Sequence, residues 1–155
     1  MVKPIPDGYP RVTPYLMIDG ASAAIDFYTS VLGATERMRM AAPGDKVGHA
    51  ELEIGESVIM LADEAPEMDA LSPGTLGGTP VSLHVYVEDA DAVFAKAIEA
   101  GAKELQPVGD KFYGDRSGSF EDPFGHRWHV ASHVEDVPPD EMEKRMAEAT
   151  ASASG

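Results

Sequence analysis

The sequence predicts an α+β fold that is built from two copies of a βαβββ unit. A strand pattern followed by an amphipathic helix and three further strand patterns occupies the first half, and the same order begins again at residue 81. Ile18 matches Val87 (87 − 18 = 69), and Ile25 matches Phe94 at the same offset (94 − 25 = 69). A half of this kind leaves one sheet face unburied, so the repeat predicts two halves that need each other.

The first half contains one helix and four expected strands. Residues 13–18 favour a strand, and Pro14 is typical of a strand start or an edge strand. Asp19 is a good N-cap for a helix over residues 21–32, whose apolar side chains share one face and which Gly33 ends. The remaining strands of this half are expected at residues 35–41, 49–54 and 57–62.

The second half repeats this order after a segment rich in Pro, Gly, Asp and Glu. A strand over 81–87 precedes a helix that Asp89 caps and Gly101 ends. Further strands are expected at residues 103–108, 117–122 and 127–132. The predicted organisation is therefore an N-terminal lead-in at 1–12, a first module at 13–63, a linker at 64–80, a second module at 81–133, and a C-terminal helix with a disordered tail at 134–155, disordered from residue 151.

The composition excludes several classes of function. The 155 residues carry 27 Asp and Glu against 12 Lys and Arg, a formal net charge of −15, which argues against binding to nucleic acid or to anionic membranes. The absence of cysteine excludes disulfides, thiolate catalysis and cysteine-based metal centres. No apolar run approaches a membrane span, and Pro and Asp interrupt any signal-peptide pattern at the start. A cytoplasmic globular protein is expected.

Several short motifs carry a resemblance to a known family. They are Ala-Ile-Asp-Phe-Tyr in the first helix, His49-Ala50-Glu51-Leu52, Tyr113-Gly114-Asp115-Arg116, and Asp122-Pro123-Phe124-Gly125 before the last strand. Together with the paired βαβββ units, they resemble the vicinal-oxygen-chelate superfamily of glyoxalases, bleomycin-resistance proteins and dioxygenases. The finer motifs are similar to its demethylubiquinone-methyltransferase-like (phosphonate-operon glyoxalase-like) branch. The resemblance implies a curled mixed sheet around a cleft with helices outside, a small-molecule ligand, and a homodimer.

The family's metal positions carry over to Thr13, Met60, Ser82 and His129. Divalent transition metals prefer His, Glu or Asp, whereas two hydroxyls and a thioether are poor ligands. The usual metal site is therefore expected to be dismantled, and no cofactor is favoured. The alternative is a divalent metal ion on a shifted site made of His84, Glu51 and His129, since strand alternation turns His84 towards the same cleft.

Alternation along the strands also selects the side chains that face the cleft. With Tyr113 and Arg116 added from the loop at 113–116, the expected ligand-binding set is Thr13, Tyr15, His49, Glu51, Met60, Ser82, His84, Tyr86, Tyr113, Arg116 and His129. Glu51 is the candidate general base, because burial raises a carboxylate pKa; the alternative is that it pairs with Arg39 or Arg127. Arg116 either clamps a carboxylate or phosphate of the ligand or pairs with Asp115 or Glu121.

Two functions remain open from the sequence. The first is a protein that binds a small, cationic or aromatic molecule in an acidic cleft without the usual metal. The second is a metal-dependent lyase, isomerase or dioxygenase-like enzyme that uses the shifted site around His84.

Overall fold

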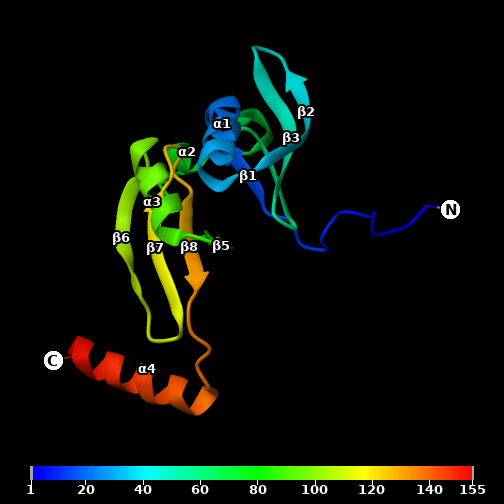
Figure 1. Ribbon diagram of the computed structural model, residues 1–155. Coiled ribbons are helices and arrows are strands. Elements are labelled where there is room, and N and C mark those ends of the chain that lie inside the picture. Colours follow the sequence, from blue (N-terminus) through cyan, green and yellow to red (C-terminus); the bar gives the residue numbers. More distant parts are fainter. Residues whose placement is uncertain (1, 155) are drawn as a thin grey trace. The chain divides into compact units, whose positions relative to one another are not determined.

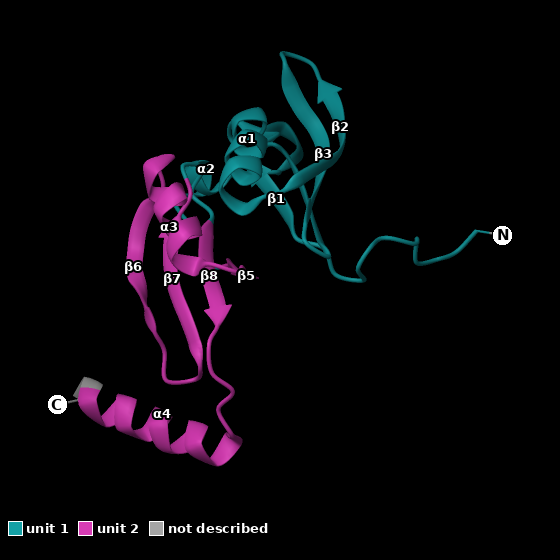
Figure 2. Cartoon of the chain, viewed as in Figure 1, with its two compact units in different colours: residues 1–80, 123–126 teal, residues 81–122, 127–155 magenta. Residues whose placement is uncertain are grey.

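A computed structural model describes residues 2–154, which form two compact units (Figure 2). Unit 1 runs to Pro80 and includes the short turn Pro123–His126, and unit 2 comprises Val81–Asp122 and the chain from Arg127 onward. The turn belongs to unit 1 because the Phe124 ring lies 6.3 Å from the Phe27 ring and His126 Nε2 donates to the Met17 carbonyl oxygen at 3.0 Å.

Unit 1 contains the first βαβββ module and two short helical segments (Figure 1). Its elements are β1 (Tyr15–Ile18), α1 (Ala21–Leu32), β2 (Thr35–Ala42), β3 (Lys46–Ile54), β4 (Ser57–Asp63), η1 (Pro66–Met68) and α2 (Pro73–Leu76). The strands form one mixed sheet in the order β1-β4-β3-β2, in which β1 and β4 run parallel and the other pairs are antiparallel.

Unit 2 repeats this topology. Its elements are β5 (Ser82–Tyr86), α3 (Ala90–Glu99), β6 (Lys103–Asp110), β7 (Asp115–Glu121), β8 (Arg127–His133) and α4 (Pro139–Ser154). The sheet order is β5-β8-β7-β6, with β5 parallel to β8. The predicted α+β fold with two βαβββ modules is therefore confirmed, and each module has a four-stranded mixed sheet with a helix packed on it.

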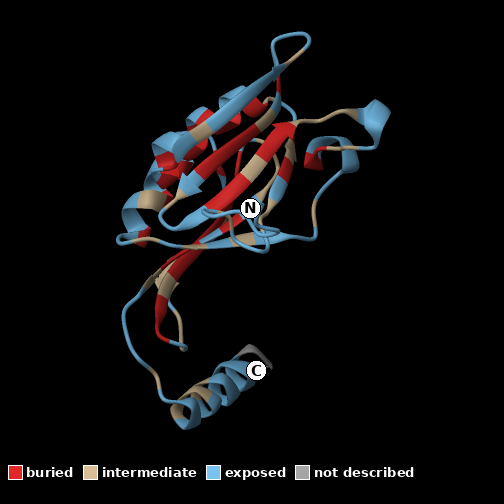
Figure 3. Ribbon diagram, turned by 90° about the vertical axis from the view of Figure 1, so that its right-hand side faces the viewer, coloured by how far each residue is buried: buried red, intermediate tan, exposed pale blue. Residues whose placement is uncertain are grey.

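Each strand next to a helix alternates buried residues with more exposed ones, and Figure 3 colours the chain by this burial. In unit 1, Leu16 and Ile18 are buried while Tyr15, which alternates with them, is 45% exposed. In unit 2, Trp128 and Val130 are buried, and the Trp128 indole N–H donates to Asp122 at 3.0 Å. Alternation thus places the sequence-predicted site residues of β1, β3, β5 and β8 on the faces away from the helices.

Helix α1 begins differently from the sequence prediction. Its N-cap is Gly20 in the left-handed region, with φ 100°, and the Asp19 side chain does not cap it. Instead, Asp63 at the end of β4 accepts from the backbone N–H groups of Gly20 and Ala21, both at 3.0 Å, and from Val47 at 2.7 Å. A glycine N-cap has no side chain to accept from the first free N–H groups, and Asp63 supplies that acceptor from a distant strand.

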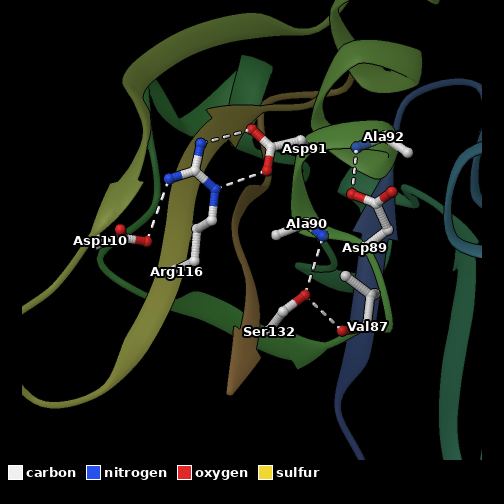
Figure 4. Close-up of polar contacts among 8 residues, drawn as sticks. All are labelled: Val87, Asp89, Ala90, Asp91, Ala92, Asp110, Arg116 and Ser132. Atoms are coloured by element: carbon white, nitrogen blue, oxygen red, sulfur yellow. Dashed lines mark hydrogen bonds and ion pairs between the residues drawn. The ribbon is translucent and has the colours of Figure 1, made fainter. Parts of the chain in front are cut away.

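Helix α3 begins as the sequence predicts, with the Asp89 carboxylate accepting from Ala92 N–H at 3.1 Å (Figure 4). A second contact ties it to the sheet: Ser132 Oγ accepts from Ala90 N–H at 2.9 Å and donates to the Val87 carbonyl at 2.7 Å. Ser132 stands 69 residues after Asp63 (132 − 63 = 69), so the repeat keeps the same contact with a different side chain.

Two connecting segments carry more structure than expected. The linker at 64–80 contains η1 and α2, and Ser72 caps α2 by accepting from Thr75 N–H at 3.4 Å. The tail expected to be disordered from residue 151 continues α4 through Ser154, and Gly155 lies outside the described residues. The first strand begins at Tyr15, two residues later than predicted.

Gly114 explains one of the sequence motifs in structural terms. Its φ is 101°, and a Cβ atom there would overlap the carbonyl oxygen of Glu135. The Gly114 carbonyl accepts from Val134 N–H at 2.9 Å and from Glu135 N–H at 3.0 Å. The glycine therefore lets the chain after β8 lie directly against the β6–β7 connection.

Candidate functional site

In unit 1, four predicted site residues lie in adjacent positions on one sheet face. Met60 of β4 is the register partner of both Tyr15 on β1 and Glu51 on β3, and His49 lies two residues before Glu51. Register partners on neighbouring strands point to the same face, so the four side chains are neighbours. The sequence prediction that Tyr15, His49, Glu51 and Met60 share a face agrees with this register.

Hydrogen bonds join three of these side chains to Tyr9, and we call Tyr9, Glu51, His49 and Tyr15 the Glu51 relay. Tyr9 Oη donates to Glu51 Oε1 at 2.7 Å, and His49 Nε2 lies 2.9 Å from Glu51 Oε2. His49 Nδ1 lies 2.8 Å from Tyr15 Oη. The relay therefore connects a buried carboxylate, which is 4% exposed, to a tyrosine hydroxyl at the surface.

The pKa of Glu51 lies below its ordinary value, which contradicts the raised pKa expected from burial. The hydrogen bond from His49 lowers this pKa most, burial opposes it, and the bond from Tyr9 lowers it further. Arg39, one expected pairing partner, bonds Glu36 instead. Arg127, the other, belongs to unit 2, where it lies 3.6 Å from Glu121, so its pairing with Glu51 stays a prediction. An ionised Glu51 whose two oxygens are both bonded is a positioning group and an acceptor.

Tyr15 stays protonated in this arrangement. Burial, and then the nearby Glu51 carboxylate, raise the pKa of Tyr15 above its ordinary value. Its ring also packs on the His49 ring, with centroids 5.4 Å apart. Tyr15 thus presents a neutral hydroxyl at the exposed end of the relay.

Unit 2 carries a second buried carboxylate behind an exposed tyrosine, and we call Tyr86, Asp115, His133 and Asp136 the Asp115 cluster. Tyr86 Oη donates to Asp115 Oδ2 at 2.8 Å, and His133 Nδ1 donates to Asp115 Oδ1 at 2.8 Å. His133 Nε2 donates to Asp136 at 2.7 Å. Asp115 is 4% exposed and Tyr86 is 61% exposed, so the pattern of unit 1 recurs with other residues.

The charges of the Asp115 cluster follow from these bonds. Burial alone raises the pKa of Asp115, but the hydrogen bonds from His133 and Tyr86 more than offset it and lower the pKa below its ordinary value. The bonds to Asp115 and Asp136 raise the pKa of His133. Both ring nitrogens of His133 donate to carboxylates, which favours the imidazolium.

His84 and His129 face each other across the parallel pair of β5 and β8. They are register partners, their ring centroids lie 6.2 Å apart, and His84 also packs edge-on against Tyr86 at 4.9 Å. Burial, and then the neighbouring His84, lower the pKa of His129. Two imidazoles on one sheet face can serve as metal ligands or as hydrogen-bonding groups.

Arg116 lies on the other face of β7, beside the helix (Figure 4). Its guanidinium bonds Asp91 at 2.7 and 3.0 Å and Asp110 at 3.2 Å. The sequence named Asp115 and Glu121 as its pairing partners, and both are wrong, because alternation turns Asp115 to the opposite face. The geometry thus places Arg116 with α3, away from Tyr86 and the histidines.

The remaining predicted residues lie near the strand ends. Thr13 precedes β1, where its hydroxyl donates to the Pro10 carbonyl at 3.4 Å, and Ser82 begins β5 in register with Arg127. Tyr113 is 37% exposed in the β6–β7 connection, and its ring lies 5.2 Å from that of Phe112. Tyr113 lies near the Asp115 cluster, since its electrostatic interaction is among the causes that raise the pKa of Tyr86.

The donor set at the family's metal positions does not fit a transition metal. Thr13, Met60 and Ser82 supply two hydroxyls and a thioether, and His129 is the one good ligand. Within residues 2–154, no group of three or more His, Cys, Asp or Glu side chains is arranged to hold a metal ion. Glu51 belongs to unit 1, while His84 and His129 belong to unit 2, so the shifted three-residue site remains a prediction.

The sequence did not identify Tyr9, Asp115 or His133 as site residues. Tyr9 reaches Glu51 across 42 residues of chain from a Pro-rich segment without periodicity, so no local pattern indicates this contact. Asp115 and His133 are register partners on β7 and β8. The beginning of β7 at residue 115, rather than the predicted 117, is the signal that would have paired them.

Comparisons with known proteins agree with this architecture. Residues 11–130 match the family model of the glyoxalase/bleomycin resistance protein/dioxygenase superfamily. The chain is 40% identical over 141 residues to Rv0887c, an uncharacterized protein of Mycobacterium tuberculosis, covering 89% of this chain and 83% of that protein. No helix in the described part of the chain has the length and apolar character needed to cross a membrane.

Solved structures share the fold. TioX from Micromonospora sp. ML1 is 26% identical, with a TM-score of 0.62 over 83% of this chain and all of the other. The PhnB protein of Bacillus cereus, a putative 3-demethylubiquinone-9 3-methyltransferase by name, has a TM-score of 0.63 at 22% identity over 79% of this chain and 99% of its own. Its likeness concerns the fold. The chain belongs to the glyoxalase/bleomycin resistance protein/dioxygenase superfamily.

Proposed function

We propose that the protein binds a small organic molecule on the polar faces of its sheets, without a metal at the family's usual positions. The observation that carries the proposal is the pairing of an exposed tyrosine with a buried, ionised carboxylate in both units. Tyr15 is linked to Glu51 through His49, and Tyr86 donates a hydrogen bond directly to Asp115. An exposed tyrosine offers a ligand both an apolar ring and a hydrogen-bonding hydroxyl, and small-molecule sites commonly combine aromatic side chains with a few polar groups.

The chemistry of the side chains favours binding over metal catalysis. Both oxygens of Glu51 accept hydrogen bonds from Tyr9 and His49, and a metal ion would have to displace them. Asp115 is similarly engaged by Tyr86 and His133. We infer that the Glu51 and Asp115 carboxylates hold tyrosine and histidine side chains in place by accepting their hydrogen bonds.

A ligand screen with mapping by NMR tests this proposal. Purified protein is screened by thermal shift against small aromatic acids, aromatic amines and neutral phenols, and each hit is mapped by ¹H–¹⁵N spectra. We expect hits to perturb residues around Tyr15 or Tyr86 and to weaken in Tyr15→Ala or Tyr86→Ala. Asp26→Asn, on the exposed surface of α1, is the control. Hits that map elsewhere, or no hits at all, would contradict the proposal.

The His84–His129 pair favours a second candidate, a metal-dependent lyase, isomerase or dioxygenase-like enzyme. The two rings lie in register on one sheet face, an arrangement that suits the first two ligands of a metal. Metal content of the purified protein and calorimetric titration with Zn²⁺ distinguish the candidates. Stoichiometric metal that is lost in His84→Ala and in His129→Ala, but kept in His126→Asn, would establish this candidate and overturn the first.

A further inference from the structure

The segment ahead of β1 is attached to the sheet of unit 1 through Tyr9. Residues 2–12 run without a helix or strand (Figure 1), and among them Tyr9 alone is half-buried while the others are exposed. The ion pair of Lys3 with Asp7, at 2.9 Å, stays within the segment, and both side chains are largely exposed. A segment with so few buried contacts belongs to the least stable part of a fold. Its attachment therefore depends on what holds Tyr9.

Tyr9 fills a site that two side chains of the sheet form around it. Its hydroxyl donates to Glu51 Oε1 at 2.7 Å, and the guanidinium of Arg37 lies 4.6 Å from the centre of its ring. Arg37 Nη1 also donates to the carbonyl oxygen of Gly8, the preceding residue, at 3.0 Å. The hydroxyl, the ring and the adjoining backbone thus each have a partner on the sheet.

A β-bulge in β2 places Arg37 beside Glu51. Glu36 is in register with Leu52 and Met38 is in register with Glu51, so Arg37 is an extra residue between two consecutive pairs. Bulges redirect side chains and are common beside functional sites. Tyr9 contacts both the Arg37 guanidinium and the Glu51 carboxylate, so these two groups lie on the same face of the sheet. The pairing of β2 with β3 therefore builds the site that the N-terminal segment fills.

The hydrogen bond between Tyr9 and Glu51 joins a proton donor to a charged acceptor. The bond to Glu51, and then burial, raise the pKa of Tyr9, so its hydroxyl keeps the proton that it donates. Hydrogen bonds to an ionised acceptor are stronger than those between neutral groups. The Glu51 side chain is only 5% exposed with Tyr9 in place. A ligand that needs Glu51 Oε1 must therefore replace Tyr9.

We propose that Tyr9 is an internal competitor for the polar face of unit 1, and that a ligand displaces it by taking the place of its ring between Glu51 and Arg37. Displacement removes the attachment of residues 2–12, and the segment becomes mobile. In the free protein, Tyr9 lowers the affinity for every ligand that needs this place. The inference rests on the proposed binding function and adds a means by which that function is regulated.

A vacated Tyr9 site tests the competition directly. p-Cresol is the tyrosine side chain as a free molecule, and 4-methylanisole has a similar size but no hydroxyl proton to donate. We expect p-cresol to bind Tyr9→Ala about tenfold or more tightly than it binds the wild type. It should also bind this variant about tenfold more tightly than 4-methylanisole does, the effect of one hydrogen bond to a charged group. ¹H–¹⁵N mapping should place p-cresol at Arg37, Met38 and Glu51.

The mobility of residues 2–12 is the second measurement. Their ¹⁵N heteronuclear NOE values should fall in Tyr9→Ala and in Tyr9→Phe, which keeps the ring but cannot donate to Glu51. Asp7→Asn is the matched control, since it removes a charge that pairs with Lys3 within the same segment, and it should keep the wild-type values. Screened molecules that perturb residues around Tyr15 should lower the same NOE values in the wild type. Thermal melting verifies that each variant is folded.

The outcomes separate this inference from the proposed function. No binding of p-cresol to Tyr9→Ala, or equal affinity of this variant and the wild type for p-cresol, would overturn the inference. Screened molecules that bind around Tyr15 while residues 2–12 keep their NOE values would overturn it too, and the proposed function would stand. If p-cresol binds Tyr9→Ala but no screened molecule binds either face of the wild type or the variant, the proposed function fails, and ligand displacement fails with it.

Discussion

Glu51 is a buried carboxylate whose stability contribution depends on its partners. We expect Glu51→Gln to lower the free energy of unfolding near neutral pH by about 1–3 kcal/mol, because an amide cannot accept from Tyr9 and His49 at the same time. Urea unfolding of both proteins measures the difference. Glu53→Gln, on the same strand, should change the free energy of unfolding by less than about 0.5 kcal/mol.

The same pair of proteins has a predictable pH dependence. The folded-state pKa of Glu51 lies below the ordinary value of 4.5, so its contribution is complete above that value and disappears as the pH falls through the lowered pKa. The difference between wild type and Glu51→Gln should therefore narrow in acid. A difference that is constant over the whole acid range would contradict this assignment.

The contribution of His133 to stability should depend on pH in the opposite direction to that of Glu51. The bonds of His133 to Asp115 and Asp136 raise its pKa, so its contribution is complete below the ordinary value of 6.5 and is lost as the pH rises through the raised pKa. His133→Gln should therefore cost more stability in mildly acidic than in alkaline solution. Unfolding experiments on both sides of that range, with an NMR titration of the His133 ring, test this. If His133→Gln lowered the free energy of unfolding equally in acid and in alkaline solution, the ion pairs of His133 with Asp115 and Asp136 would be contradicted.

For single residues, the sequence predicted which sheet face a side chain occupies better than it predicted the charge state of a buried group. Strand alternation was sufficient to place Tyr15, His49, Glu51 and Met60 on one face. It could not predict the direction of the Glu51 pKa shift, which depends first on the hydrogen bond from His49 and then on the one from Tyr9, 42 residues away. The charge state of a buried group is decided by partners that only the folded chain brings together.

Among the elements, helix α1 depends on the Asp63 carboxylate of β4. Asp63→Ala should lower the free energy of unfolding by about 2 kcal/mol, because three backbone N–H groups of α1 and β3 lose their acceptor. Asp19→Ala is the matched control and should cost less than about 0.5 kcal/mol. If Asp19→Ala lowered the free energy of unfolding more than Asp63→Ala does, Asp19 would be the cap, as the sequence predicted.

The helices illustrate what local sequence can specify. The bounds of α1 agree with its apolar periodicity and its terminal glycine, and Asp89 caps α3 as its position predicted. The cap of α1 escaped prediction because its acceptor lies 42 residues further along the chain from Ala21 (63 − 21 = 42). Local patterns determine where a helix runs, whereas tertiary contacts decide what holds its first turn.

For the whole molecule, we expect a homodimer. Large apolar side chains remain exposed on the sheet face of unit 1, with Met40 at 52%, and Tyr86 is 61% exposed in unit 2. Exposed apolar surface of this kind is typical of an interface or a ligand site. Sedimentation equilibrium should give twice the 16.5 kDa chain mass. Added salt should strengthen association, since two chains of net charge −15 repel each other. A chain-mass species at every concentration would contradict the dimer.

The two halves hold their helices with side chains of different chemistry at equivalent positions. Burial raises the pKa of Asp63, but the N–H groups of Ala21, Val47 and Gly20 more than offset this, so the anchor of α1 is a charged acceptor. Ser132, which anchors α3, has no charge to lose. Protonation in strong acid therefore weakens the Asp63 contact and leaves the equivalent Ser132 contact unchanged, so two modules with the same topology differ in the acid resistance of this one contact between helix and sheet.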